Sequence, residues 1–229
     1  MNTLTPEAPV TLHLTAAGRA IERDSFATID REAGPHGYAA DQWAIVRRLI
    51  HSSGDFEFNG LSEFHPDAVA AGVAAVGQGG TAIVADVGMI VAGLSKTRLA
   101  HFGLAAHQFI DHPALIAQAR AEGTTIAVQA MRHAHAAGLL DGALVGVGNA
   151  PTALIEIVRL IREHGVRPAL VIGMPVGFVS AADSKALLAT VSEVPWMICR
   201  GRKGGSTLVV AALHALMALA EAEQQRQTT

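Results

Sequence analysis

Short apolar runs alternate with longer amphipathic stretches through most of the chain. The short runs, rich in β-branched side chains, predict strands at 81–86, 104–110, 143–148, 169–174 and 196–199. Over 151–165, apolar residues recur at three- and four-residue steps, which predicts a helix that Gly165 is placed to end. Strands that alternate with helices predict an α/β fold: a mainly parallel sheet of about five strands, with helices on both faces.

The N-terminal part of the chain has a helical pattern without strand-like runs. The pattern is clearest around 19–34 and 41–51, within a segment of about 15–78, and the sheet-and-helix core follows at about 80–225. No repeat, low-complexity block or linker divides the sequence. One doubly wound domain is the simplest organisation, and ligands of such domains bind at the carboxyl ends of the strands.

Three strand-to-helix turns are expected to meet at that edge. Asn149 is predicted to cap one helix, with Pro151 in its first turn, where a missing N–H costs little. Ser180 and Asp183 have the spacing of a capping box before a second helix. The third turn, 200–206, precedes a long apolar helix. Because helix N-termini expose N–H groups, the edge predicts a site for a ligand with acidic groups.

The segment Arg200–Gly205 contains three cations and three glycines directly after a predicted strand. Arginine can bind a carboxylate through two parallel hydrogen bonds, and glycines let backbone N–H groups approach a ligand. A solvated basic turn is an equal alternative. The formal net charge of −3 gives no global basic field for nucleic acid, so an anionic ligand needs such a local patch.

Two familiar motifs match only in part. Gly146-Val147-Gly148 begins a dinucleotide fingerprint, but its third glycine would fall at Pro151, and a tight turn into a helix explains both glycines. A generic nucleotide binder is therefore a remote alternative. No G-x-S-x-G elbow occurs, which disfavours a Ser-His-Asp hydrolase.

The chain has 11 histidines, and their spacing does not predict a metal site. His133 and His135 are two residues apart on a predicted helix, so they face different directions, and no Cys/His cluster occurs. His214 lies on the apolar C-terminal helix and is expected to be packed there.

His51 has a different setting, at the end of a predicted helix and before Ser52-Ser53-Gly54-Asp55. The partial negative charge of the last carbonyls favours a protonated imidazole, which suits a proton donor. Arg47 and Arg48 oppose that protonation unless a polyacidic ligand neutralises them. An ordinary residue at a helix end is an equal alternative from the local sequence.

Composition and segment lengths predict the class of protein. Half of the residues are hydrophobic and 16% are charged, which is enough for a sizeable α/β core. The lone Cys199 cannot form an internal disulfide. No leader pattern begins the sequence, and the apolar runs are broken before the roughly 18 residues that span a bilayer. We expect a cytoplasmic protein that binds neither membrane nor nucleic acid.

The chain resembles the precorrin-8X/cobalt-precorrin-8 methylmutase family over nearly its whole length. The most specific blocks are VGNAPTALIEIVRLI at 147–161, VIGMPVGFVSAADSKALL at 171–188 and ICRGRKGGSTL at 198–208. N-terminal support comes from 20–33, 47–58 and 84–94. The resemblance implies one flavodoxin-like, three-layer α/β/α domain over residues 1–229 that works as a homodimer with active sites near the subunit interface.

The resemblance also implies a reaction. Family members move a methyl group from C11 to C12 of precorrin-8X or its cobalt form, without a cofactor, and give hydrogenobyrinate or cobyrinate. His51 matches the family's catalytic histidine and would act as general acid, and the product could pass to neighbouring enzymes of the pathway. Residues expected to bind substrate are Ser25, Arg48, Asp86, Thr124, Thr125, Asn149, Arg200, Arg202, Gly204 and Gly205.

The sequence departs from the family pattern at a few positions. Thr125 takes the place of an arginine, Gly88 that of an acidic residue, and Arg23 and Asp24 are displaced before Ser25. These changes leave two hypotheses, an enzyme with altered contacts and a non-catalytic tetrapyrrole-binding or carrier paralogue. His51 and the C-terminal blocks favour the enzyme.

Overall fold

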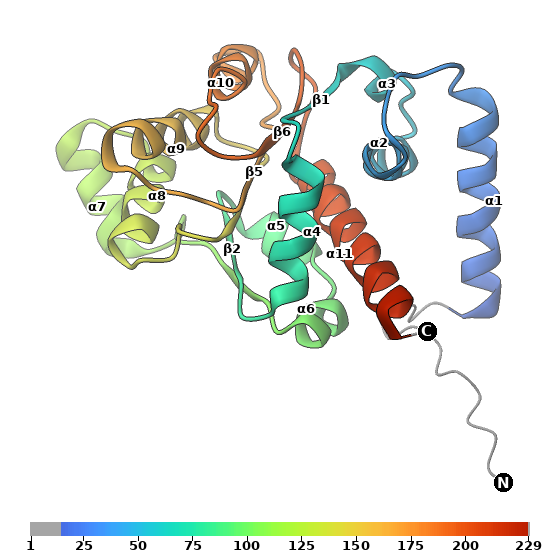
Figure 1. Ribbon diagram of the computed structural model, residues 1–229. Helices are drawn as coiled ribbons and strands as arrows, with labels where there is room; N and C mark the ends of the chain where they lie inside the picture. The colour runs from blue at the N-terminus through green and yellow to red at the C-terminus, as the bar shows by residue number, and fades with distance from the viewer. Residues whose placement is uncertain (1–14, 229) are drawn as a thin grey trace, which may run out of the picture.

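Residues 15–228, the part that the computed structural model describes, form a six-stranded sheet in the order β1-β6-β5-β4-β2-β3 with helices around it (Figure 1). The strands are β1 (Ser62–Phe64), β2 (Ala82–Ala85), β3 (Ala105–His107), β4 (Leu144–Val147), β5 (Leu170–Gly173) and β6 (Trp196–Cys199). The N-terminal helices are α1 (Ala16–Glu32), α2 (Ala40–Ser53), α3 (Phe58–Leu61) and α4 (Ala68–Gln78). The others are α5 (Gly88–Gly93), α6 (Lys96–Phe102), α7 (Pro113–Glu122), α8 (Ile126–Ala136), α9 (Pro151–His164), α10 (Ala181–Leu188) and α11 (Ser206–Thr228).

The five predicted strands are confirmed and run parallel from β2 to β6. Numbered one to five along the chain, they lie in the order 2-1-3-4-5, which is the flavodoxin-like order. The run 104–110 gives only a short strand, Ala105–His107. The prediction missed β1, which pairs antiparallel with β6 at one edge. It is three residues long, so no period could be read from it.

Helices cover both faces of the sheet, as expected for parallel strands that are buried throughout. In β4, β5 and β6 every residue is buried. Helices α2, α4, α5, α6 and α11 pack on one face, and α8, α9 and α10 pack on the other, with α7 beside α8 (Figure 1). This is the predicted three-layer arrangement.

Helix α1 lies outside these three layers, against α2 (Figure 1). Arg47 of α2 pairs with Asp30 of α1 at 2.7 Å. Ile29 is the buried residue of α1, whereas Ile21 is 70% exposed. The contact with α2 therefore fixes α1, and α2 in turn packs on α11.

Helix α11 is long and apolar enough to cross a membrane, by length and composition alone, and it is the one such helix among the described residues. More than half of its most apolar window, 56%, is buried inside the fold. Its buried side chains pack against α2 and α4, which accounts for its composition as that of a core helix.

Close packing against α11 explains the two glycines of the partial dinucleotide motif. A Cβ on Gly146 would lie 2.7 Å from a methyl group of Val209, and a Cβ on Gly148 would lie 2.8 Å from backbone atoms of Ser206. Both positions need glycine because α11 starts against β4. The motif therefore has a packing explanation and carries no indication of a nucleotide.

Two predicted helix caps are wrong. Ala150, not Asn149, is the N-cap of α9, and it has no side-chain cap, although Pro151 does occupy the first turn. Ser180 has a left-handed backbone, φ 58°, and no capping hydrogen bond, so its spacing from Asp183 does not form a capping box. The predicted end of α9 at Gly165 is confirmed, with φ 69°.

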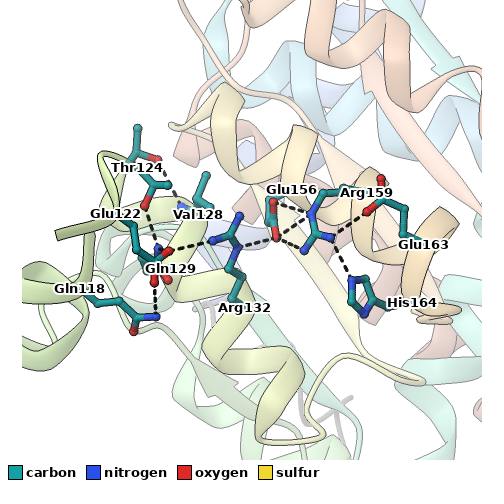
Figure 2. A network of polar contacts seen from close by, with 11 residues as sticks. Gln118, Glu122, Thr124, Val128, Gln129, Arg132, Glu156, Arg159, Glu163 and His164 are labelled. Carbon is teal, nitrogen blue, oxygen red and sulfur yellow. Dashed lines mark hydrogen bonds and ion pairs between the residues drawn. The ribbon is translucent and has the colours of Figure 1, made fainter. Parts of the chain in front are cut away.

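A continuous set of polar contacts joins α7, α8 and α9 (Figure 2). Gln129 donates to Glu122 at 2.7 Å and to the Thr124 hydroxyl at 2.8 Å. Arg132 donates to Glu122 at 3.1 Å and to the nearly buried Glu156 of α9 at 2.9 Å. These contacts fix the loop between α7 and α8, which carries Thr124.

Gly148→Ala should destabilise the fold, because the added methyl group meets the Ser206 backbone, which cannot move without shifting α11. Overpacking of this kind costs about 1–3 kcal/mol, measurable by urea unfolding. Gly77→Ala is the matched control. Gly77 lies in α4 with open space around its Cβ position, so alanine should stabilise by roughly 0.5–1 kcal/mol. Equal stabilities for the two variants would contradict the packing argument.

Candidate active site

His51 lies in the last turn of α2 and faces α1. The helix continues two residues beyond the predicted end and stops at Gly54, whose φ of 67° suits glycine. Nδ1 of His51 lies 2.8 Å from the hydroxyl oxygen of Ser25 on α1. Since Ser25 engages Nδ1, Nε2 is the ring nitrogen left to act on a ligand. The packing of α1 on α2 thus brings two predicted site residues together.

Aromatic and cationic groups surround this pair. The Phe26 ring lies edge-on to the imidazole of His51, with centroids 5.2 Å apart. The guanidinium of Arg48 lies 5.3 Å from the Phe26 centroid and pairs with Glu22 at 2.9 Å. Arg48, which was predicted to bind substrate, therefore lies close to His51 and Ser25. A carboxylate ligand could compete with Glu22 for it.

The environment of His51 changes the predicted proton affinity. Burial lowers the pKa of His51, the charge of Arg48 lowers it further, and Glu22 raises it in part. The expectation that the helix end favours the protonated ring is therefore wrong for the ligand-free protein. The expected opposition from Arg48 is confirmed, because desolvation and a like charge both disfavour an imidazolium.

A cavity of about 450 Å³ opens between α1 and the end of α2. Ser25 and His51 line it together with apolar side chains, including those of Ile21, Ile50 and Phe56. The size falls within the range of small-molecule sites. Asp24, Thr28 and Glu32 also line the cavity, so its wall is mixed. Apolar side chains beside one hydrogen-bonded imidazole suit a partly apolar ligand that undergoes proton transfer.

The basic loop 200–205 is tied into the protein more firmly than its sequence indicates. Arg200 pairs with Glu63 at 3.0 Å and donates to the carbonyl of Gly60 at 3.1 Å. Lys203 pairs with Asp55 and, at 2.9 Å, with Glu57. Neither acidic partner was predicted, although both stand within six residues of His51 in the sequence. Lys203 thus joins the loop to the segment that follows the His51 helix.

Arg202 is the cation of this loop without a carboxylate partner in the described part of the chain. It is exposed, and its guanidinium lies 5.4 Å from the centroid of Phe178, which is 85% exposed. Its backbone carbonyl accepts a hydrogen bond from Gly177 at 3.1 Å. A fixed backbone and an unpaired guanidinium make Arg202 the best placed loop cation for a ligand carboxylate.

The predicted glycines of the loop are needed for its close approach to the turn after β5. A Cβ on Gly204 would lie 2.3 Å from the carbonyl oxygen of Met174, which leaves no room for a side chain. Gly205 has φ 136° and donates to the same carbonyl at 2.8 Å. The Gly205 N–H of the loop is therefore bonded to another part of the protein and is not available to a ligand.

Asp86 does not have the position predicted for a substrate contact. It is fully buried after β2, and its carboxylate accepts backbone N–H bonds from Gly148 at 3.0 Å, Asn149 at 2.8 Å and Ala150 at 2.6 Å. Burial raises its pKa, and the hydrogen bonds oppose that change. Asp86 occupies donors that an anion at the switch point of the sheet would use. It positions the turn and the exposed Asn149.

Thr124 and Thr125 lie near the start of α9. Thr124 accepts from Gln129, and Thr125 caps α8 and lies 2.9 Å, oxygen to oxygen, from Thr152. Neither threonine lines the cavity that contains His51, and their hydroxyl groups form hydrogen bonds with Gln129, Val128 and Thr152. A Cβ on Gly88 would meet Gln108 at 4.0 Å, so the position has room for a side chain.

The other histidines that the sequence singled out on helices, His133, His135 and His214, have contacts inside the protein. His133 lies against Phe109, with centroids 4.7 Å apart, and His135 lies 5.6 Å from His164, so the pair faces different directions as predicted. His214 accepts from the Ser95 N–H at 3.1 Å. Among the described residues, no three His, Cys, Asp or Glu side chains gather as a metal site would require.

Comparisons with known proteins agree with the resemblance found in the sequence. The family model described as precorrin-8X methylmutase matches residues 20–219. The cobalt-precorrin-8 methylmutase of Leptospira interrogans is 42% identical over 218 residues, covering 93% of this chain and 99% of the relative. The precorrin-8X methylmutase of Pseudomonas aeruginosa is 41% identical over 202 residues, covering 87% of this chain and 94% of the relative.

A solved structure extends the match to three dimensions. The precorrin-8x methyl mutase from Thermus thermophilus is 51% identical and superposes with a TM-score of 0.84, covering 90% of this chain and 98% of that chain. Sequence and fold agree over nearly the full length of each relative, so the chain belongs to the precorrin-8X methylmutases, a family of isomerases in cobalamin biosynthesis.

Proposed function

We propose that the chain moves a methyl group from C11 to C12 of precorrin-8X or its cobalt form, to give hydrogenobyrinate or cobyrinate, with His51 as general acid. The observation that carries this proposal is the hydrogen-bonded Ser25–His51 pair on the wall of a cavity, in a chain of this family. The relatives' names include both the cobalt and the cobalt-free substrate.

Ser25 sets the direction of proton transfer. In the protonated ring, Nδ1–H donates to the Ser25 hydroxyl, which leaves Nε2–H to donate to the macrocycle. A proton on the ring system makes the receiving carbon electron-poor. The bond from the methyl group to C11 then breaks as the bond to C12 forms, and the borrowed proton returns to His51. The reaction needs no net change in protons, so one acid suffices.

Substrate binding supplies the protonation that the ligand-free site disfavours. The substrate is fringed with acetate and propionate groups, and Arg48 is the cation whose charge lowers the pKa of His51. A carboxylate bound to Arg48 offsets that charge and raises the pKa of His51 in the complex. His51 is then protonated mainly when the macrocycle is bound.

Other carboxylates of the substrate would bind along the sheet edge. Arg202 offers an exposed guanidinium, and Asn149 is held outward by the contacts of its backbone with Asp86. Thr125 lies against Thr152 in the first turn of α9, and the hydroxyl groups of Thr124 and Thr125 could donate to a further carboxylate. Arg200 would help only if it exchanged Glu63 for the ligand.

A carrier that binds tetrapyrrole without converting it is the second candidate. In its favour, the resemblance implies an arginine where Thr125 stands, and the Thr125 hydroxyl is already bonded to Thr152. The cavity residues His51 and Ser25 favour catalysis, because a carrier has no use for a hydrogen-bonded acid on the cavity wall.

We also propose that two copies form the working unit, in the cytoplasm, and that product passes to the next enzymes of the pathway. Support for the dimer comes from α1, which packs on α2 and exposes Ile21 at the mouth of the cavity. A second copy covering Ile21 would shield the cavity from water, which favours reactions of a sensitive ring.

His51→Ala should lower kcat about 10²–10⁴-fold, the usual contribution of a general acid, and leave tetrapyrrole binding largely intact. Ser25→Ala should have a smaller effect, since the acid remains but loses its orienting partner. Absorbance records conversion of precorrin-8X and binding in one cuvette. His101→Ala, on the surface at the end of α6, is the matched control. Wild-type protein that binds one chromophore and never converts it would support the carrier instead.

The reaction should slow as pH rises through the titration of His51. For the free enzyme, the pKa of His51 is lowered from its ordinary value of 6.5, so kcat/KM should already fall as pH rises through the range below 6.5. If substrate carboxylates neutralise Arg48, kcat should persist to a higher pH than kcat/KM. Rates measured from about pH 5 to 9 give both profiles. An increase in rate with pH over this range would contradict the acid role.

Size-exclusion chromatography with light scattering should give a dimer mass for the wild-type chain. Ile21→Glu should weaken that dimer, because it places a charge where an apolar side chain is 70% exposed. Ile155→Glu, at a 39% exposed apolar position on α9 in the opposite layer, is the control and should stay dimeric. A monomeric wild-type protein at assay concentration would contradict the dimer.

A further inference from the structure

Lys185 of α10 is fully buried, one of the largest side chains in the chain to be so. Its ammonium donates to the backbone carbonyl of Lys203, in the basic loop, at 2.7 Å. Burial lowers the pKa of Lys185. A buried cation costs stability compared with an apolar side chain of the same length, so its presence calls for a reason other than packing.

The carbonyl of Lys203 is held by a second donor. The thiol of Cys199, the last residue of β6, lies 3.0 Å from the same oxygen. Cys199 and Lys185 approach from the sheet and from α10, so one peptide group of the loop is fixed from two elements of the fold. The neighbouring Gly204 is packed against Met174 with no space for a side chain. The Lys203 carbonyl is thus a fixed point at the centre of the loop, between the Arg202 carbonyl held by Gly177 and the Gly205 N–H held by Met174.

The side chain of Lys203 extends from this fixed point to the segment that follows the His51 helix. It pairs with Asp55 and Glu57, in the segment directly after α2. Gly54, which ends α2, and His51 both line the cavity. On the other side, Arg202 is attached through the adjacent peptide. Displacement of the Lys203 carbonyl would therefore move both the unpaired guanidinium and the contact with the His51 segment.

We propose that Lys185 is a positioning residue of the methylmutase reaction: its buried ammonium fixes the Lys203 carbonyl and thereby sets the basic loop for the carboxylates of the substrate. The proposal rests on the proposed function of the loop. Lys185 does not touch the substrate; it acts through the peptide of Lys203 and the guanidinium of Arg202. Methionine, with similar length and no charge, would pack in its place without making the hydrogen bond.

Lys185→Met separates a positioning role from a structural one. Replacement of a buried cation by an apolar side chain is neutral or stabilising in many proteins, so the melting temperature should be unchanged or higher. Loss of a charged hydrogen bond to the loop should weaken tetrapyrrole binding roughly tenfold, with kcat changed by less than about threefold. Four quantities are measured on the same full-length protein: the dissociation constant from an absorbance titration with precorrin-8X, KM, kcat and the melting temperature.

Lys96→Met is the matched control, because Lys96 is an exposed lysine at the start of α6 and should leave all four quantities as in the wild type. If Lys185→Met does not fold, the second donor tests the same point. Cys199→Ala removes that donor and should raise KM, whereas Cys199→Ser keeps a donor and should raise KM less.

The outcomes separate this proposal from the proposed function. Wild-type protein that binds but does not convert precorrin-8X would overturn the enzyme, while the dissociation constants would still test Lys185. Wild-type binding by Lys185→Met, or a fall in melting temperature that accounts for its weaker binding, would overturn the positioning role. Equal KM values for Cys199→Ala and Cys199→Ser would overturn it as well.

Discussion

The close approach of α11 to the sheet and to its neighbouring helices is the contact on which the other features depend. Four glycines make room for this helix: Gly72 faces Leu216, Gly93 faces Val210, Gly146 faces Val209 and Gly148 faces Ser206. The start of α11 therefore has one position relative to β4, and the loop 200–205 just before it has one path. On its outer side α11 supports α2, whose last turn carries His51. One packed helix thus places both the loop and the imidazole.

The candidate site consists of two parts that come from different layers. The Ser25–His51 pair belongs to α1 and α2, outside the sheet, whereas Arg202, Asn149 and the threonines lie at the sheet edge. Lys203 connects the two parts through its contacts with Asp55 and Glu57. A large ligand with one reacting position and many carboxylates is suited to such a division, because recognition and chemistry can occur at separate points of the ring.

The buried charged groups Asp86 and Lys185 hold backbone turns in position more than they stabilise the fold. The carboxylate of Asp86 holds three N–H groups that would otherwise be available to a ligand, and the ammonium of Lys185 holds one carbonyl. Both groups are fully buried, and desolvation opposes the charged form of each. Asp86 and Lys185 each fix a turn at the carboxyl ends of the strands. A flexible turn there would leave the side chains of the site less precisely placed.

Local pattern determined much of this protein from the sequence alone. The five parallel strands, the end of α9 at Gly165 and the family follow from short-range periodicity and ordered motifs, since each depends on residues close together in the chain. Tertiary structure decided the rest. The burial and partners of Asp86 and Lys185 depend on long-range packing. Asp86, for example, accepts from a turn 62 residues away. The lowered pKa of His51 likewise comes from burial and from the charge of Arg48, which outweigh the opposing charge of Glu22.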